Sequence, residues 1–297
     1  MAVGKHQVTI VIPALNEEKA IGLVLDELFE AGFKNVLVVD GYSLDGTVKI
    51  AEGRGVRVIQ QNGHGKTGAL KTAVTYVDTP YMLVMDGDYT YCAKDIERLL
   101  NHGERYTHVI GFRDRKNISL VHRFGNYVIT RTFNILFGNS LSDVCSGMYL
   151  LRTEVARRFE FGSKGFGTEV EILAQSAAGH DVTEVPISYR RRIGPSHLST
   201  WRHGFQILRS TVGLARRYNT VFFFSALAAA AMIPAAFMVG YALCLNFFVG
   251  VWEFNLLLFG CFLFLFGALG LTVATIALLI KRMERRILQR IEKDRAA

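Results

Sequence analysis

The stretch YMLVMDGDYTY, residues 81–91, joins a short apolar run to two carboxylates, Asp86 and Asp88, that stand one glycine apart. The run from Met82 to Met85 is typical of a buried strand, and the acids follow where such a strand ends. Two carboxylates this close repel each other unless a cation or solvent compensates them. The stretch therefore predicts a core strand that presents two acids at the edge of a sheet, where Mg2+ or Mn2+ is the divalent cofactor that fits them.

Strand-like and helix-like patterns alternate through the first 112 residues. Apolar runs typical of strands lie at 8–14, 35–41, 56–61, 81–86 and 107–112, with helical patterns at 17–31, 45–52 and 66–77. This alternation predicts an α/β fold with a mostly parallel, Rossmann-like sheet covered by helices on both faces. Such sheets bind ligands at the carboxyl ends of their strands, where Asp40, Asp86 and Asp88 all fall.

Beyond residue 112 the pattern is looser. We expect a helix at 120–137, a strand that leads into a helix at 146–155, a helix at 168–178 and a strand with a basic end at 181–192. The next expected helix, 200–218, has an apolar stripe on one side and arginines seven residues apart on another. This pattern is typical of a helix in the membrane interface, and an amphipathic helix packed on its own domain is the alternative.

Residues 218–280 differ from the rest of the chain because Glu253 is their only charged residue. The uncharged runs 221–252 and 254–280 each exceed the ~20 apolar residues that a membrane-spanning helix needs. Buried core helices are the alternative, but they rarely run this long without a polar face. The predicted organisation is a globular domain at 1–199, an interfacial helix at 200–218, a transmembrane helical hairpin at 219–281 and a basic tail at 282–297.

Basic residues beside the apolar runs predict the orientation of the hairpin. Arg216 and Arg217 precede the first run, further basic residues follow the second, and the linker around Glu253 has none. By the positive-inside rule, the large domain and both termini are expected in the cytoplasm, and the start of the chain shows no signal-peptide pattern. Much of the net charge of +8 lies beside the runs, so anionic lipid headgroups explain it better than nucleic acid does.

Three further stretches place polar residues after predicted strands: VIPALNEE (11–18), VVDGYSLDGT (38–47) and NGHGKTGALKTAV (62–74). The last is a glycine-rich turn that leads into a helix with Lys66 at its mouth. Such a turn can hold a phosphate through backbone N–H groups and one lysine. It lacks the spacing of a Walker P-loop. The four scattered cysteines have no metal-ligand spacing and predict no disulfide.

In this order and spacing, VIPALNE, VVDGYSLDGT, GKTGAL and DGDYT resemble glycosyltransferase family 2. The resemblance continues through 143–155, 167–192 and 194–199, and so covers nearly all of residues 7–199. It implies a GT-A fold, a nucleotide-sugar donor and inversion of the anomeric centre. Within the family, the chain is similar to dolichyl- or polyprenyl-phosphate mannosyltransferases and their glucosyl relatives.

The resemblance implies roles for individual residues. For the nucleotide sugar it implies a pocket that includes Pro13, Leu15, Glu17, Asp40 and Asp86 and is closed by Arg190, Arg192 and Ser196, and Lys66 joins this pocket by the phosphate argument above. For the metal it implies Asp88, with Asp86 and Thr90 beside it. For the acceptor phosphate it implies Arg113 and Arg123, which complete the expected catalytic set with Asp88. Composition alone favours solvated surface arginines at these two positions, and the resemblance reverses that preference.

Three positions depart from the family pattern. Gly41 stands where relatives usually carry a second acid, so one nucleotide contact is lost or shifted. Thr90 stands where relatives often carry glutamine, so it is a weaker metal ligand or none. His197 replaces a lysine common in the closing loop, which weakens the case for a fixed positive charge there.

The resemblance implies inverting transfer of mannose from GDP-mannose to dolichyl or polyprenyl phosphate at the cytoplasmic membrane face. Glycosyl transfer passes through an oxocarbenium-like transition state and releases a nucleoside diphosphate, whose charge a metal and nearby cations must absorb. A lipid phosphate needs no general base, because its second pKa is about 6 and it is largely dianionic at neutral pH. Arginines can position it through forked hydrogen bonds.

The sequence leaves several alternatives open. They are a UDP-glucose-dependent enzyme that makes the glucosyl lipid, a processive or sugar-hydroxyl transferase, and a membrane scaffold that keeps the fold without catalysis. A nucleic-acid binder is weaker still, because no RNA-reading motif is present. The apolar runs hold no Asp, Lys, Arg or His, so we expect them to anchor the chain. Gly267 and Gly270 allow close packing, which raises pairing with a second protomer as an open question.

Overall fold

The computed structural model describes residues 2–162, 167–194 and 200–296. In helices α8 (Thr200–Tyr218) and α10 (Phe254–Ala296) it describes the backbone but not the side chains of residues 200–206, 281–282 and 284–296. The chain divides into two compact units, residues 1–214 and 215–297. The boundary between the units falls inside α8, the helix that the sequence predicts as interfacial.

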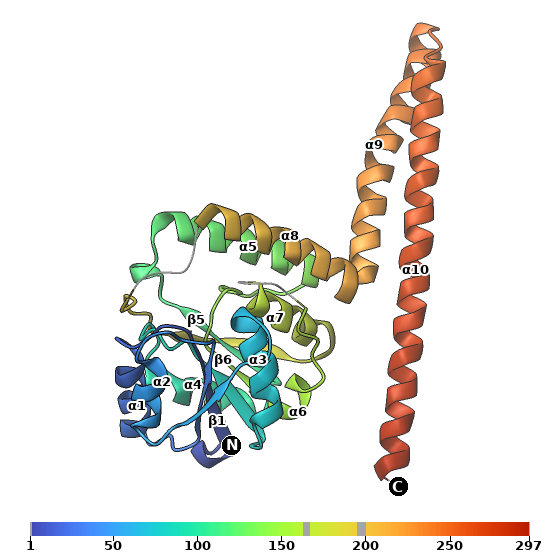
Figure 1. Cartoon of the computed structure of the whole chain (residues 1–297). Helices are drawn as coiled ribbons and strands as arrows, with labels where there is room; N and C mark the ends of the chain where they lie inside the picture. Colours follow the sequence, from blue (N-terminus) through green and yellow to red (C-terminus); the bar gives the residue numbers. More distant parts are fainter. Residues whose placement is uncertain (1, 163–166, 195–199, 297) are drawn as a thin grey trace. The chain divides into compact units, whose positions relative to one another are not determined.

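A seven-stranded sheet organises the first unit (Figure 1). Its strands are β1 Val8–Ala14, β2 Val36–Asp40, β3 Arg57–Gln60, β4 Tyr81–Val84, β5 His108–Arg113, β6 Tyr149–Arg152 and β7 Val182–Ile187. They lie in the order β3-β2-β1-β4-β6-β5-β7. Strand β6 runs antiparallel to both of its neighbours, and the other pairs are parallel. The prediction of an α/β fold with a mostly parallel sheet is confirmed.

Helices cover both faces of this sheet, with α1, α2 and α4 on one side and α3 and α7 on the other (Figure 1). The helices of the first unit are α1 Ile21–Glu30, α2 Thr47–Glu52, α3 Gly65–Tyr76, α4 Ile96–Gly103, α5 Leu120–Phe137, α6 Thr153–Ala156, α7 Thr168–Gly179 and α8. Short 3-10 turns lie at Lys5–Gln7, Ala93–Asp95 and Arg115–Asn117. The bounds of β1 and α5 coincide with those predicted, whereas α1 begins four residues later than its pattern.

The central strands β1 and β4 are apolar along most of their length because both of their faces are covered. Ile10, Ile12 and Leu83 are fully buried in the core. Met85 follows β4 and is buried as well, so Asp86 is the first residue after β4 that reaches the edge of the sheet. The stretch 81–91 therefore ends a core strand with acids at the carboxyl edge, as predicted.

Among the described residues, three non-glycine residues have positive φ angles, and each lies in the loop that follows a parallel strand. Asn16 (φ 54°) follows β1, Tyr42 (φ 67°) follows β2 and Tyr89 (φ 67°) follows β4. The left-handed conformation costs an L-residue about 1 kcal/mol or more, so surrounding contacts must hold these turns in place. Because β1, β2 and β4 are parallel neighbours, all three strained turns meet at the same edge of the sheet.

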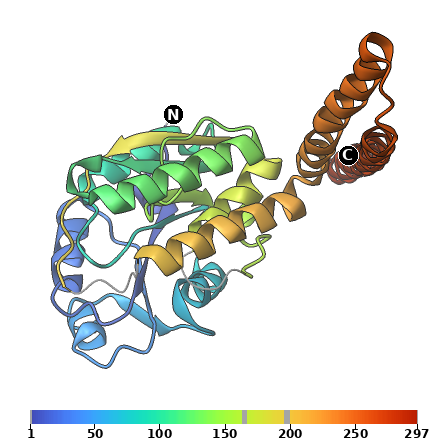
Figure 2. The same cartoon turned by 90° about the horizontal axis from the view of Figure 1, so that it is seen from above.

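Helices α5 and α8 lie side by side beyond that edge (Figures 1 and 2). The hydroxyl of Ser119 caps the start of α5 by accepting the N–H of His122, and α5 ends at Gly138 with a φ of 66°. Residues Ile129 and Phe133 of α5 are buried, whereas Leu120 and Phe124 near its start are exposed. The helix thus packs on the domain by its second half and leaves apolar side chains uncovered at its first turns.

The second unit is a hairpin of α9 (Thr220–Val249) and α10, whose segments Thr220–Val249 and Phe254–Ile280 are long and apolar enough to cross a membrane. Gly267 and Gly270 lie against α9 of the same chain. A Cβ at Gly267 would approach the carbonyl oxygen of Ala228 to 3.0 Å, and one at Gly270 would approach the Cβ of Ala228 to 3.2 Å. Packing within the hairpin therefore accounts for both glycines without a second protomer.

Candidate active site

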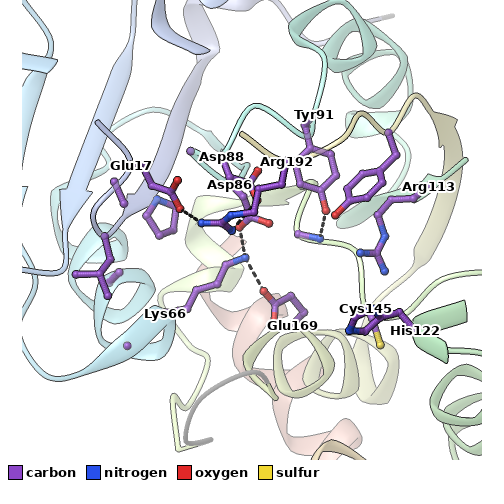
Figure 3. Close-up of a pocket in the computed structure, with 18 of the residues that line it drawn as sticks. Glu17, Lys66, Asp86, Asp88, Tyr91, Arg113, His122, Cys145, Glu169 and Arg192 are labelled. Carbon is purple, nitrogen blue, oxygen red and sulfur yellow. Dashed lines mark hydrogen bonds and ion pairs between the residues drawn. The ribbon is translucent and has the colours of Figure 1, made fainter. Parts of the chain in front are cut away.

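A cavity of about 660 Å³ opens where the loops after β1, β2 and β4 meet (Figure 3). Its acidic end is formed by Glu17, Lys66, Asp86, Asp88 and Arg192. Its apolar end is formed by Ile118, Val121, Ile129 and Ile207. The two ends lie over different parts of the sheet, because the acidic end follows β1 and β4 whereas α5 follows β5.

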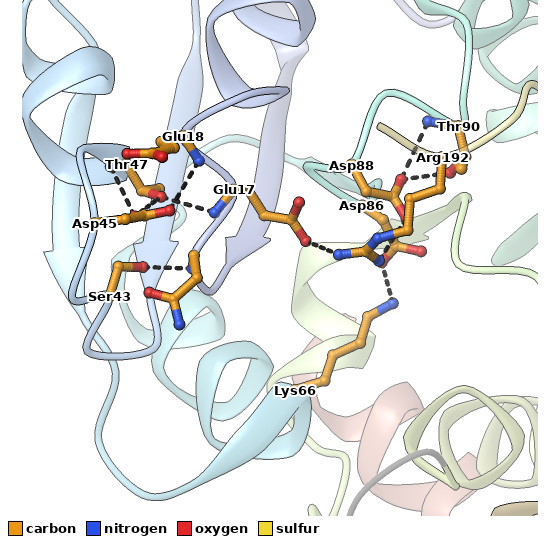
Figure 4. Close-up of polar contacts among 11 residues, drawn as sticks. Glu17, Glu18, Ser43, Asp45, Thr47, Lys66, Asp86, Asp88, Thr90 and Arg192 are labelled. Carbon is orange, nitrogen blue, oxygen red and sulfur yellow. Dashed lines mark hydrogen bonds and ion pairs between the residues drawn. The ribbon is translucent and has the colours of Figure 1, made fainter. Parts of the chain in front are cut away.

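Two cations hold the carboxylates at the acidic end (Figures 3 and 4). The ammonium of Lys66 pairs with Asp86 and lies 2.6 Å from the Oε1 atom of Glu169. The guanidinium of Arg192 pairs with Glu17 and donates from Nη1 to Oδ2 of Asp88 at 2.9 Å. Both cations come from elements far from the acids in sequence, so the cluster exists only in the folded chain.

The acidic end carries more negative than positive charge. Together with Glu169, which pairs with Lys66, four carboxylates face two cations, which leaves an excess of two negative charges at neutral pH when all are ionised. Burial raises the pKa of Glu17 to about 7; the charge of Arg192 lowers this pKa, and those of Asp88 and Asp86 raise it. Burial and the charge of Asp86 likewise raise the pKa of Asp88. The site is therefore electrostatically disposed to take up a cation.

The acidic end fits a hard divalent ion that also binds a substrate. Within the described part of the chain, no group of three or more His, Cys, Asp or Glu side chains is arranged to hold a metal alone. Asp86 and Asp88 could offer carboxylate oxygens to such an ion, because magnesium-like ions bind one or two carboxylates and complete their shell with substrate phosphates and water. Thr90 is buried, and its N–H and hydroxyl both donate to Oδ1 of Asp88. Thr90 therefore orients the Asp88 carboxylate, and its role as a ligand stays a prediction.

The segment after β7 crosses the loop that carries the paired acids. The N–H of Arg190 donates to the carbonyl of Thr90 at 2.8 Å, and the N–H of Ile193 donates to the carbonyl of Asp88 at 3.2 Å. These bonds bring the Arg192 side chain into the cavity. Strand β7 ends at Ile187. The basic end of the strand predicted at 181–192 is therefore not strand but forms this crossing segment. Ser196 lies outside the described residues.

Arg190 points away from the cavity lining. Its guanidinium makes two hydrogen bonds to Glu27 of α1, at 2.7 and 2.8 Å. It also lies over the ring of Tyr89, 4.6 Å from the ring centroid. The structure therefore gives Arg190 the role of fastening the crossing segment to α1, and only its neighbour Arg192 reaches the pocket.

The loops after β1 and β2 form the rest of the acidic end, where Pro13, Leu15, Gly41 and Tyr42 line the cavity. Asp40 is buried and does not line it. Its Oδ2 accepts the N–H groups of Tyr42, at 3.0 Å, and Ser43, at 3.1 Å. Asp40 thus shapes the strained turn at Tyr42, and the turn, rather than the acid, lines the cavity.

A network of hydrogen bonds ties these two loops together (Figure 4). The N–H of Asn16 donates to the hydroxyl of Ser43 at 2.9 Å, and the N–H of Glu17 donates to that of Thr47 at 2.8 Å. The carboxylate of Asp45 accepts from Thr47 and from the N–H of Glu18. The position of Glu17 in the cavity is therefore fixed by its backbone.

Arg113 reaches the cavity beside the apolar end. It forms a two-pronged ion pair with Asp143, with Nε to Oδ2 at 2.6 Å and Nη2 to Oδ1 at 2.9 Å. Its guanidinium also lies 5.2 Å from the ring centroid of Tyr189. Arg123 is exposed on α5 and is not among the lining residues, whereas the preceding residue, His122, is. Of the two predicted phosphate arginines, the structure brings only Arg113 to the pocket.

Sequence reasoning missed several residues that shape the site. Glu169, at the first turn of α7, faces Lys66, although the sequence leaves it equally well explained as a helix-surface residue. Asp143 holds Arg113, and the hydroxyl of Tyr91 accepts the N–H of Gly147 at 2.7 Å. Residues of the stretches DVCSG and GTEVEIL reach the site only because segments distant in sequence pack together. No local sequence pattern reveals this packing.

Comparisons with known proteins agree with this architecture. Among solved structures, glucosyl-3-phosphoglycerate synthase from Mycobacterium tuberculosis, in complex with Mn2+, UDP-glucose and phosphoglyceric acid, superimposes with a TM-score of 0.58 at 20% identity, covering 71% of this chain and 79% of that one. This likeness shows that the chain shares the GT-A fold.

Sequence comparisons make the assignment narrower. Residues 9–159 match the family described as Glycosyl transferase family 2. The chain is 36% identical to glycosyltransferase AglJ of Haloferax volcanii, covering 73% of this chain and 75% of that protein. It is 34% identical to a dolichyl-phosphate hexose transferase of the same organism, covering 68% of this chain and 91% of that protein. The chain belongs to glycosyltransferase family 2, as its motifs predicted.

Proposed function

We propose that this protein transfers a hexose, with inversion, from a nucleoside diphosphate sugar to dolichyl or another polyprenyl phosphate. The observation that carries the proposal is that one cavity has both an acidic end and an apolar end. The acidic end suits a metal-bound diphosphate, and the apolar end suits the first isoprene units of a lipid. The relative named dolichyl-phosphate hexose transferase supports the same acceptor.

GDP-mannose is the donor that we propose, and dolichyl or polyprenyl phosphate mannose is the product. The alternative is UDP-glucose, which would give the glucosyl lipid. The nucleobase of the donor would bind beside Leu15 and Tyr42, between loops that a hydrogen-bond network fixes. Because the carboxylate of Asp40 accepts backbone N–H groups, the nucleobase would be selected mainly by the shape of these turns.

Asp86 and Asp88 would hold the divalent cation, which would be Mg2+ or Mn2+. When bound, the ion would neutralise the charge that develops on the leaving diphosphate. Lys66 and Arg192 flank the two acids, and both can add positive charge at the same place. Two observations support this assignment. The acidic end has an excess of negative charge that a cation can neutralise, and Lys66 and Arg192 lie beside it to contact a bound diphosphate.

Arg113 would orient the acceptor phosphate. Its guanidinium is already fixed by Asp143 and Tyr189, so little conformational entropy is lost when it forms a further hydrogen bond. A dianionic phosphate attacks without a general base, so the chain need only align its oxygen with the anomeric carbon. Arg123, exposed on α5, would meet the phosphate from the membrane side in this proposal.

The acceptor lipid also implies a place at a membrane. The start of α5 exposes Leu120 and Phe124 beside Arg123, a mixture of apolar and basic groups that suits a lipid headgroup region. We propose that the first unit and both termini lie in the cytoplasm and that α9 and α10 anchor the chain. Anchoring raises the effective concentration of an acceptor whose phosphate lies at headgroup height.

The proposal is tested by sugar transfer in detergent-purified protein. A short polyprenyl phosphate is incubated with GDP-mannose, UDP-glucose or UDP-N-acetylglucosamine, each with Mg2+, with Mn2+ and with EDTA. Chelator-sensitive mannolipid is the expected product. If only glucolipid formed, the donor would be reassigned to UDP-glucose. If sugar were transferred only to a sugar hydroxyl, the acceptor would be reassigned. Folded protein that transfers nothing and binds no nucleotide would favour a scaffold.

A further inference from the structure

Glu169 holds a position in the cavity that the roles above do not explain. It opens helix α7, and its side chain is 13% exposed and lines the cavity. Within the described part of the chain, the one ion-pair partner of its carboxylate is Lys66, which lies 2.6 Å from Oε1. Among the described residues, the other carboxylate oxygen, Oε2, makes no ion pair, and the side chain lines the cavity that a ligand would enter.

The start of α7 is anchored, so this carboxylate is held in place. The hydroxyls of Thr67, in α3, and Thr168, in α7, lie 2.6 Å apart and share a hydrogen bond. Lys66 forms ion pairs with both Asp86 and Glu169. The pair is therefore a fixed acceptor beside a cationic donor.

The pair lies at the margin of the acidic end. Figure 3 shows Glu169 with Lys66 and Asp86 on one side and Cys145 on the other. Cys145 in turn lies by Asp143 and Arg113, whose charges, with that of Glu169, act on its thiol. The anomeric carbon of the transferred hexose lies between the leaving diphosphate and the acceptor phosphate. With the diphosphate at Asp86 and Asp88 and the acceptor phosphate at Arg113, as proposed above, the sugar ring would lie beside Glu169.

Hydroxyl groups of a sugar are both donors and acceptors, and a carboxylate next to an ammonium offers both complements. Charge-assisted hydrogen bonds of this kind are short and directional. A base for the attacking phosphate is not needed, so catalysis does not require Glu169 to accept a proton from the acceptor. The carboxylate of Glu169 can therefore serve to bind the hydroxyls of the sugar.

We propose that Glu169, supported by Lys66, binds hydroxyls of the donor hexose and sets which epimer is transferred. This inference rests on the proposed hexose transfer and adds the residue that selects the sugar. A site built to bind a hydroxyl discriminates strongly against a sugar that lacks it in that position, because its polar groups are then left unpaired.

The test compares the preferred donor with its C2 and C4 epimers on the same nucleotide. In Glu169→Gln, the ratio of kcat/KM between preferred donor and epimers should fall about 10- to 100-fold. Glu169→Asp keeps the charge that holds Lys66 but withdraws the carboxylate by one methylene, and its ratio should fall as well. Glu154→Gln, an exposed glutamate on α6, is the matched control and should change nothing.

A binding measurement separates recognition of the sugar from support of the metal site. With Mn2+ present, the affinity of the free nucleoside diphosphate should stay within about twofold of wild type, whereas the gain in affinity from its sugar should shrink. An unchanged epimer ratio in folded, active variants would overturn the inference, as would equal losses for nucleotide and nucleotide sugar. Wild-type protein that transfers no hexose would instead contradict the proposed function.

Discussion

The two ends of the cavity are built differently. The acidic end consists of loops that directly follow parallel strands, hold strained turns and are cross-linked by hydrogen bonds. The apolar end depends on α5, which leaves Leu120 and Phe124 exposed near its start. The first end is preorganised around charge, which a metal-bound diphosphate requires. The second offers an apolar surface, which a long isoprenoid can use in more than one arrangement.

This contrast teaches where specificity should reside. A fixed set of charges discriminates strongly between ligands, because a misplaced polar group is left unpaired. An apolar surface discriminates weakly, by only about 1–3 kcal/mol for each methylene. We therefore expect strict selection of the nucleotide sugar and tolerance toward lipid length, and the following changes probe each end.

The largest effect is expected from Asp88→Asn. The substitution keeps the shape of the side chain but removes one of the two charges proposed to hold the metal, so transfer should fall by about 100- to 1000-fold. The measurement is the initial rate across a Mn2+ titration, with Asp26→Asn, an exposed partner of Arg54, as control. If the Asp88 variant kept its transfer rate and this transfer were still sensitive to chelator, the metal would have to bind outside the acidic end.

The next effect concerns Arg113 and its partner. Asp143→Ala leaves a nearly buried guanidinium without its carboxylate, which should cost about 3 kcal/mol of stability and lower the Tm by roughly 6–12 °C. Thermal unfolding measures this loss. The double variant Arg113→Met, Asp143→Leu should recover most of the stability, because two apolar groups replace the pair, while transfer stays low. Recovery of transfer as well would mean that Arg113 does not touch the acceptor.

The same contrast explains how much the sequence could predict. The paired acids follow an apolar strand directly, so the position of Asp86 and Asp88 at the sheet edge could be derived from the pattern of residues 81–91. Arg192 could be placed by resemblance. Arg190 could not be separated from it, because its partner Glu27 lies 163 residues away and the choice between ligand and ion pair is made by packing.

Asp40 and Glu169 show the limit from opposite directions. An acid at the end of a strand can face a ligand or cap its own turn, and the sequence is the same in both cases; here the carboxylate of Asp40 accepts two backbone N–H groups. An acid in the first turn of a helix is common on protein surfaces. Glu169 faces the cavity only because α7 packs beside α3.

A smaller effect should appear in the pH dependence of stability. The pKa of Glu17 rises from 4.5 to about 7 on folding, mainly through burial. Between these values the folded chain holds a proton that the unfolded chain has released, so stability should fall as the pH rises through this window. The loss attributable to Glu17 is on the order of 2 kcal/mol. Tm values at pH 5 and 7.5 in EDTA measure it.

Glu17→Gln supplies the matched comparison for this slope. It keeps a hydrogen-bonding group beside Arg192 but cannot ionise, so its Tm should change less between the two pH values than that of the wild type. Added Mn2+ should also flatten the wild-type slope, because a cation favours the ionised carboxylates around it. Parallel pH curves for the two proteins would show that the charge at Glu17 is fully compensated within the fold.

The smallest effect is expected at the apolar end, from Phe124→Glu. The phenyl ring is exposed in the first turns of α5, and its partial burial in a lipid headgroup region would contribute about 1.5 kcal/mol. Transfer to a long polyprenyl phosphate in anionic vesicles should therefore fall by about tenfold, whereas transfer to a short acceptor in detergent should not change. Leu23→Glu, at an exposed apolar position on α1, should leave both rates unaltered. Equal losses with both acceptors would place Phe124 in the binding of the acceptor itself and make the apolar end as selective as the acidic one.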